Sequence, residues 1–162
     1  MKKYKNWIIG ANLLAIIVYF TFTIIQKEKT LKDGKLILLE LAPVDPRSLM
    51  QGDYMRLRYS IADSITPTEP PPRGYVVIRL NAEGIAKGIR IQNNTTPLNK
   101  DEILIKYTMS NRNSLNIGAE SFFFQEGHAT KYEQAKFGGI RVDNKGNSLL
   151  IGLYDESEKI IK

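Results

Sequence analysis

Hydrophobic residues are distributed unevenly along this chain, and the longest apolar run lies near the N-terminus. Residues 7–25 read WIIGANLLAIIVYFTFTII, which is 19 residues without a charge. As a helix rising 1.5 Å per residue, this run is roughly 28 Å long, close to the hydrocarbon thickness of a bilayer. We therefore predict one transmembrane helix over residues 7–25, preceded by a short tail (residues 1–6) and followed by a lysine-rich stalk (residues 26–34).

A cleaved signal peptide is the alternative interpretation of the apolar run. Its hydrophobic region would span about 7–15 residues and end at a small-x-small cleavage site. This run is longer and continues into Gln26 and Lys27 without such a site. We therefore predict that the helix is retained as an anchor.

Residues 35–162 alternate between short apolar runs and turn signals, which predicts one strand-rich domain. Residues 54–61 (YMRLRYSI) show the clearest period of two, which places Met55, Leu57, Tyr59 and Ile61 on one face of a strand. Residues 121–125 carry three adjacent phenylalanines and are predicted as a strand covered on both faces. Further strands are predicted over residues 35–41, 74–80, 85–92, 103–107, 139–142 and 148–154.

Turn residues complete the predicted domain. Asn81 to Gly84 and Asp143 to Gly146 each suit a hairpin turn, and residues 129–136 are the one predicted short helix. Several short strands separated by turns indicate a mainly β fold. We expect an antiparallel sandwich or a partly closed barrel behind the N-terminal transmembrane helix.

The position of the charges changes what the net charge of +6 implies. Residues 1–32 hold six lysines and one acid, whereas residues 33–162 hold 17 basic and 16 acidic residues. The domain is therefore nearly neutral, which argues against nucleic-acid binding. The tail carries the denser lysine cluster, so we expect it to be cytoplasmic and the domain extracytoplasmic, at the inner membrane of the cell.

Candidate metal ligands are few. The chain has no cysteine, which excludes thiolate ligands and thiolate nucleophiles. Glu126 and Glu133 flank the lone histidine, His128. A single histidine without a second strong ligand is typical of a solvated turn, so no metal site and no cofactor are predicted.

Residues 52–59 read GDYMRLRY, and this segment resembles the motif of the GDYXXLXY family of bacterial membrane-anchored proteins. Gly52, Asp53, Tyr54, Leu57 and Tyr59 match its defining positions. The C-terminal half is also similar to the family, through Glu126-Gly127, Tyr132-Glu133 and Ala135. The family has no characterised function. The resemblance implies a multi-spanning membrane protein as the partner.

Two interpretations of the motif stay open. In the first, Gly52 and Asp53 form a turn, and Leu57 and Tyr59 are core residues of the strand that follows. In the second, Asp53, Tyr54 and Arg56 border a site on the surface, near Glu126.

No complete catalytic set is present in the sequence, so we predict that the protein is not an enzyme. Type I signal peptidases also carry a Gly-Asp turn after a proline segment, but the position that would hold their nucleophile is Pro43 here. Ser48 lies in a predicted loop without a positioned base. The function favoured is a membrane-anchored accessory or interaction protein. The alternative is a tethered hydrolase using Ser48 or the group of Glu126, His128 and Glu133, or a ligand-binding domain near Asp53 and Glu126.

Overall fold

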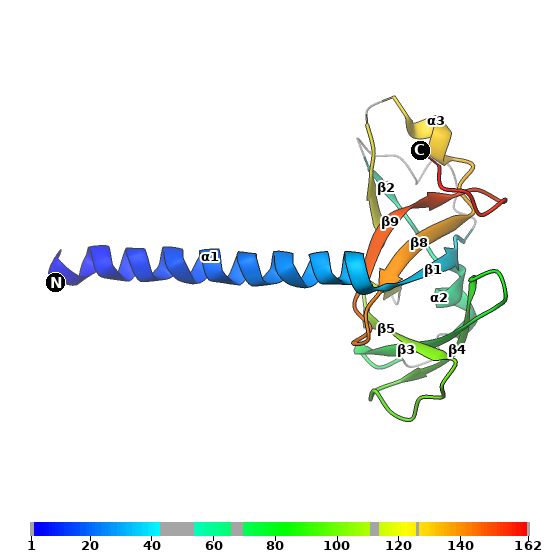
Figure 1. Ribbon diagram of the computed structural model, residues 1–162, viewed down its shortest axis with the longest axis horizontal. Helices are drawn as coiled ribbons and strands as arrows, with labels where there is room; N and C mark the ends of the chain where they lie inside the picture. The colour runs from blue at the N-terminus through cyan, green and yellow to red at the C-terminus, as the bar shows by residue number, and fades with distance from the viewer. Residues whose placement is uncertain (1, 43–53, 66–69, 111–113, 126, 162) are drawn as a thin grey trace.

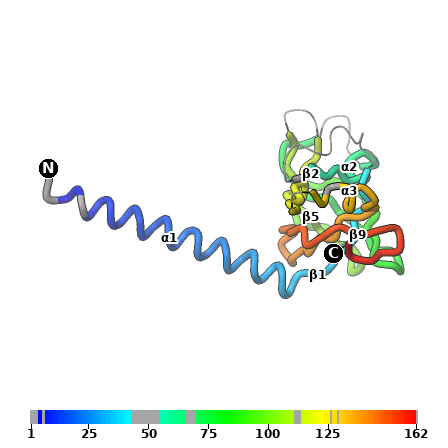
Figure 2. The backbone as a smooth tube through the Cα atoms, turned by 90° about the horizontal axis from the view of Figure 1, so that it is seen from above, coloured from blue at the N-terminus to red at the C-terminus, as the bar shows by residue number. Residues whose placement is uncertain are grey.

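A computed structural model describes residues 2–42, 54–65, 70–110, 114–125 and 127–161 of the chain. One long helix projects from a β-rich domain and contacts that domain only at its C-terminal end (Figure 1), and a view turned by 90° shows the same arrangement (Figure 2). The helices are α1 (Lys2–Asp33), α2 (Ser60–Ile65) and α3 (Ala129–Tyr132). The strands are β1 (Lys35–Glu40), β2 (Tyr54–Arg56), β3 (Arg73–Leu80), β4 (Ala86–Gln92), β5 (Glu102–Met109), β6 (Leu115–Asn116), β7 (Ser121–Phe123), β8 (Phe137–Val142) and β9 (Ser148–Tyr154).

The strands form antiparallel sheets, as the sequence predicts. Among the described residues the sheet orders are β1-β8-β9, β2-β7 and β4-β3-β5-β6. Backbone contacts also join the two larger sheets at both edges: Leu38 N–H donates to Gly84 O, and Lys106 N–H donates to Gly146 O. The predicted mainly β, antiparallel fold behind one N-terminal helix is confirmed, in the form of three sheets within the described part of the chain.

One hydrophobic core fills the space between the sheets. Ile37 and Leu39 of β1, Ile78 of β3, Ile105 of β5 and Ile140 of β8 are fully buried. Each of them has a buried residue on one side and an exposed or partly exposed residue on the other, and β1, β3 and β8 each bury three consecutive residues. These strands were therefore predicted as short apolar runs and not from strict alternation. The two predicted hairpins join β3 to β4 and β8 to β9.

The predicted strand over residues 54–61 is wrong beyond Arg56, although its buried face is correct. Met55, Leu57, Tyr59 and Ile61 are all buried. The chain changes partner along this segment: β2 pairs with β7, whereas Arg58 O accepts a hydrogen bond from Ala42 N–H and Tyr59 bridges to Leu41. The continuous ladder therefore ends early, and α2, which the sequence analysis missed, begins at Ser60.

Residues 121–125 are also not covered on both faces. Only Ser121–Phe123 form a strand, and the Phe123 side chain is 73% exposed. Phe122 packs against the core, whereas Phe123 lies on the opposite face of β7. The predicted short helix is shorter than expected, ending at Tyr132.

Residues 26–34, predicted as a stalk, continue α1 to Asp33 and pack against the domain. Thr30 is 5% exposed, and its hydroxyl hydrogen-bonds to the carboxylate of Asp143, in the β8–β9 turn, at 3.4 Å. Arg141 donates to the backbone oxygen of Gly34 at 2.8 Å. A Cβ atom on Gly34 would overlap the Thr30 carbonyl oxygen. The helix is therefore joined to the domain through a packed contact, which we call the helix–domain joint.

Candidate functional site

A cleft of about 500 Å³ lies beside the motif segment. Its buried and half-buried floor is apolar and includes Leu41, Ala42, Met55 and Leu57. Its rim consists of exposed charged side chains, which are Glu40, Arg58, Glu133, Lys136 and Glu156. We call this feature the motif cleft.

Backbone hydrogen bonds hold the walls of the motif cleft together. Leu41 N–H donates to Lys136 O at 2.9 Å, and Ala42 N–H donates to Arg58 O at 2.8 Å. Lys136 N–H in turn donates to Tyr154 O at 2.9 Å. The end of β1, the motif segment and the segment after α3 are thus fixed relative to one another, although they are far apart in the sequence.

Two motif residues are core residues, as the first interpretation predicts. Leu57 and Tyr59 are each 4% exposed. The Tyr59 hydroxyl donates to Ala119 O at 2.5 Å. Burial, together with the nearby Glu120 carboxylate, raises the pKa of Tyr59 well above its ordinary value, so the phenol stays protonated. A Cβ on Gly138 would lie 2.8 Å from Cε1 of Tyr59, so only glycine leaves room for this ring.

The arginines of the motif segment lie on its solvent side. Arg56 and Arg58 are exposed, on the face opposite Leu57. Arg58 Nη2 lies 2.5 Å from Asp63 Oδ1 of α2. Arg58 therefore borders the motif cleft as part of an ion pair, whereas Arg56 does not line the cleft.

The C-terminal residues that are similar to the family have different positions: some line the motif cleft and others shape the segment next to it. Glu133 is exposed on the rim of the motif cleft, and Tyr132 lines it. The Tyr132 ring packs against Phe122 and Phe124, with ring centroids 4.9 Å and 5.6 Å away. Gly127 has a φ of 83° in the turn before α3, a conformation that favours glycine. The structure therefore brings Leu57, Tyr132 and Glu133 together at one cleft.

Several predicted site residues lie outside the described part of the chain. These are Gly52, Asp53, Glu126 and Ser48, together with the side chain of Tyr54. The backbone of Tyr54 belongs to β2 and pairs with Phe123. The proposed convergence of Asp53 and Glu126 stays a prediction.

A metal centre finds no support in the described segments. His128 is exposed at the start of α3. Across residues 2–42, 54–65, 70–110, 114–125 and 127–161, no group of three or more His, Asp and Glu side chains is placed to hold a metal ion.

Sequence reasoning missed four of the charged rim residues: Glu40, Arg58, Lys136 and Glu156. They come from four different segments, and tertiary pairing brings them to one cleft. Two of them carried a local signal. Arg58 lies in the motif segment, on the face that the period of two places opposite Leu57 and Tyr59, and Lys136 ends the predicted helix next to Ala135. Chemically, an apolar floor within a rim of both charge signs suits an extended or helical peptide segment with an apolar side chain and flanking charges.

Comparisons with known proteins give one match. A family model described as GDYXXLXY protein matches residues 16–153, which is most of the chain, and the chain belongs to this family. No curated protein and no solved structure matches it.

Proposed function

We propose that this GDYXXLXY protein is a membrane-anchored interaction protein, whose domain binds a segment of an integral membrane protein through the motif cleft. The observation that carries the proposal is the combination of an exposed apolar helix with the packed helix–domain joint. A domain joined in this way is presented at one height and in one orientation above the bilayer.

Membrane anchoring rests on the character of α1. The segment Trp7–Asp33 is long and apolar enough to cross a bilayer, and none of its most apolar 18-residue stretch is buried by the rest of the protein. Large apolar side chains exposed along a whole helix are unfavourable in water, whereas lipid accommodates them. The lysines of the tail favour a cytoplasmic N-terminus and an extracytoplasmic domain at the inner membrane.

A partner within the membrane fits two further features. Gly10 has no atom near the position that a Cβ would take, so another helix can approach α1 closely there. In addition, the motif cleft is fixed by the joint relative to α1. A protein with several spans offers both a helix for α1 and an extramembrane segment for the motif cleft.

The proposed activity is binding without catalysis. Tyr59, the second tyrosine of the motif, is buried and its hydroxyl donates a hydrogen bond to a backbone carbonyl, so it serves packing. The cleft rim carries carboxylates and cations, and among the described residues no serine or threonine lines it. The hydrolase alternative depends on Ser48 and Glu126, and complementation of a deletion strain by Ser48→Ala and Glu126→Ala variants would remove it.

Affinity purification in a mild detergent tests the proposal. We expect the full chain to recover a membrane protein, and the charge reversals Glu133→Lys and Lys136→Glu together to reduce recovery about tenfold, because the rim charges would then mismatch the partner. The matched control is Glu83→Lys with Lys87→Glu in the β3–β4 hairpin, which makes the same two exchanges on exposed residues.

The control should recover the partner as well as the parent chain does. Purification of the parent chain as a solitary monomer would contradict the proposal, and so would equal recovery by both reversed variants.

A further inference from the structure

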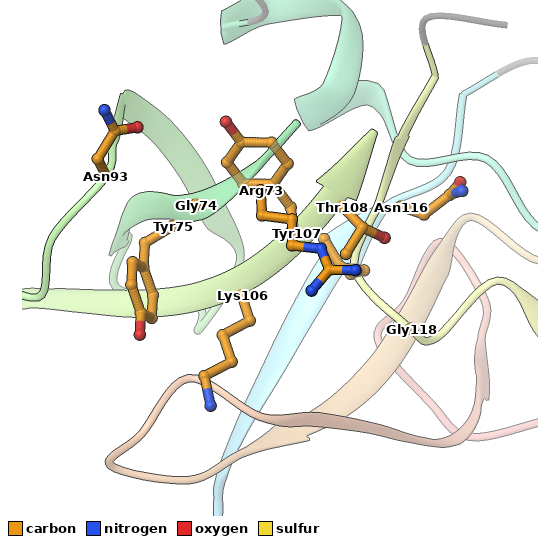
Figure 3. Close-up of a pocket in the computed structure, with 10 residues that line it drawn as sticks. Arg73, Gly74, Tyr75, Asn93, Lys106, Tyr107, Thr108, Asn116 and Gly118 are labelled. Carbon is orange, nitrogen blue, oxygen red and sulfur yellow. The ribbon is translucent and has the colours of Figure 1, made fainter. Parts of the chain in front are cut away.

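A second cavity of about 390 Å³ lies on the sheet formed by β3, β4, β5 and β6, away from the motif cleft. Figure 3 shows its lining side chains. The polar ones are two cations, Arg73 and Lys106, and a group of amides and hydroxyls: Tyr75, Asn93, Tyr107, Thr108 and Asn116. Among the described residues, no carboxylate lines the cavity.

Strand register explains why these side chains converge. Residues that pair directly across an antiparallel ladder point to the same face of the sheet. Tyr75 pairs with Lys106, whereas Arg73 pairs with Thr108, and Thr108 pairs with Asn116. These five residues are therefore on one face, in two adjacent rows. In Figure 3 the side chains of Tyr75 and Lys106 point to the same side, and Arg73 lies next to Thr108.

The two cations of the cavity are not neutralised within the described part of the chain. Arg58, Arg79 and Arg90 all pair with carboxylates, but Arg73 has no ion pair among the described residues. Lys106 Nζ donates to the amide oxygen of Asn147 at 2.8 Å, and that partner carries no charge. Near the rim, the Glu120 carboxylate already accepts hydrogen bonds from the backbone N–H groups of Ile117 and Gly118.

The Tyr107 hydroxyl donates to Pro71 O, so the neutral donors that remain are Tyr75, Asn93, Thr108 and Asn116. A cavity with these donors and two cations that no carboxylate of the described residues neutralises suits an anion with many acceptor atoms. A phosphate offers three or four oxygens, whereas a carboxylate offers only two. Arginine with lysine is a common combination for phosphate recognition. The volume exceeds what one phosphate fills, so there is room for the group to which the phosphate is attached.

The cavity also lies at the α1 end of the domain. A chain of hydrogen bonds connects the cavity residue Lys106 to α1. Lys106 donates to Asn147, Asn147 donates to Asp143 at 2.7 Å, and Thr30 of α1 also donates to Asp143. The part of α1 between Ile25 and Asp33 is about 12 Å long, and lipid headgroups occupy roughly 5–8 Å beyond the hydrocarbon. If α1 crosses the membrane, long cationic side chains on this side of the domain lie within reach of headgroup phosphates.

From this geometry we infer that the cavity lined by Arg73 and Lys106 binds a phosphate ester. The source is either the headgroup of an anionic phospholipid or a soluble phosphate compound. The lipid source rests on the proposed membrane anchoring, whereas the phosphate chemistry of the cavity does not.

Native mass spectrometry of the full chain in a neutral maltoside detergent tests the inference. The probes are phosphatidylglycerol, phosphatidylcholine and glycerol 3-phosphate, each titrated separately. We expect the parent chain to bind phosphatidylglycerol or glycerol 3-phosphate, and the Arg73→Ala and Lys106→Ala double variant to bind at least about tenfold more weakly, because two charge-assisted contacts are lost.

Two further variants separate binding from folding and from overall charge. Arg73→Lys with Lys106→Arg keeps both charges and should retain binding within about threefold of the parent chain. Lys87→Ala with Lys131→Ala removes the same net charge from exposed positions outside the cavity and should bind as the parent chain does.

Tighter binding of phosphatidylglycerol than of glycerol 3-phosphate would assign the lipid source, and the reverse would assign a soluble ligand. Equal binding by the parent chain and the alanine double variant would overturn the inference, as would no binding of any probe. Because glycerol 3-phosphate binding needs neither a membrane nor a protein partner, its outcome is independent of the purification experiment above.

Discussion

The period-of-two pattern of the motif indicated correctly which of its side chains are buried. It gave no indication of ion pairs between separate strands. Leu57 and Tyr59 were predicted as core residues from the period of two alone, and this is confirmed. Glu102 was not singled out. It is 6% exposed, because Arg90 of the neighbouring hairpin donates two hydrogen bonds to its carboxylate at 2.8 Å and 2.9 Å. No local pattern marks a pair formed between separate strands.

Acid titration tests the Glu102 ion pair. The hydrogen bond from Arg90, followed by that from the Asn99 backbone N–H, lowers the pKa of Glu102 from its ordinary 4.5 to about 2. The folded state binds this proton more weakly than the unfolded state. The pair therefore stabilises the fold above about pH 5, and that stability is lost as the pH falls toward 2.

We expect Glu102→Gln to lower the urea midpoint at neutral pH and to flatten its decline between about pH 5 and pH 2. The measurement is urea unfolding of the full chain in detergent, followed by circular dichroism. Glu83→Gln, on the exposed β3–β4 hairpin, should keep the slope of the parent chain. An equal slope for Glu102→Gln and the parent chain would show that the pair does not carry this pH dependence.

At the scale of elements, the sequence was informative wherever structure depends on neighbours along the chain. Both hairpins and the strand over residues 148–154 were predicted correctly, because turn residues and short apolar runs are local signals. The length of β2, the position of α2 and the exposure of Phe123 depend on which strand pairs with which. The motif cleft could not be predicted from the sequence for the same reason, since its rim residues come from segments that only tertiary pairing brings together.

The helix–domain joint is the element-level feature with the clearest test. In Gly34→Ala, the new Cβ would overlap the Thr30 carbonyl oxygen and lie 3.2 Å from Val142 O. Such overpacking costs about 1–3 kcal/mol and should loosen the joint. Spin labels are attached to Lys29→Cys in α1 and Lys87→Cys in β4, and only there, because the chain has no other cysteine. The distribution of distances between the two labels reports how firmly α1 is held against the domain.

We expect a narrow distribution in the parent chain and a broad one in Gly34→Ala. Gly10→Ala is the matched control, because nothing lies near the position of its Cβ, and it should leave the distribution narrow. A distribution that is already broad in the parent chain would mean that α1 is a flexible tether.

At the scale of the whole molecule, the structure combines a single apolar helix with a β-rich domain fixed at its end (Figure 1). The sequence predicted this layout, because a long uncharged run and short alternating runs are distinct signals. The sequence did not reveal that the lysine-rich segment after the apolar run is helical and packed. That property depends on Thr30 and Gly34 contacting the β8–β9 turn and β8.

The most direct test of the account asks whether the two ends of the molecule lie on opposite sides of a membrane. Single cysteines are introduced at Tyr4→Cys in the tail and Thr130→Cys in α3, which keeps every lysine in place. Intact cells are then treated with a membrane-impermeant maleimide, and the same cells are treated after permeabilisation. We predict labelling of Thr130→Cys in intact cells, and labelling of Tyr4→Cys only after permeabilisation. Labelling of both positions in intact cells, or of Tyr4→Cys alone, would contradict the account.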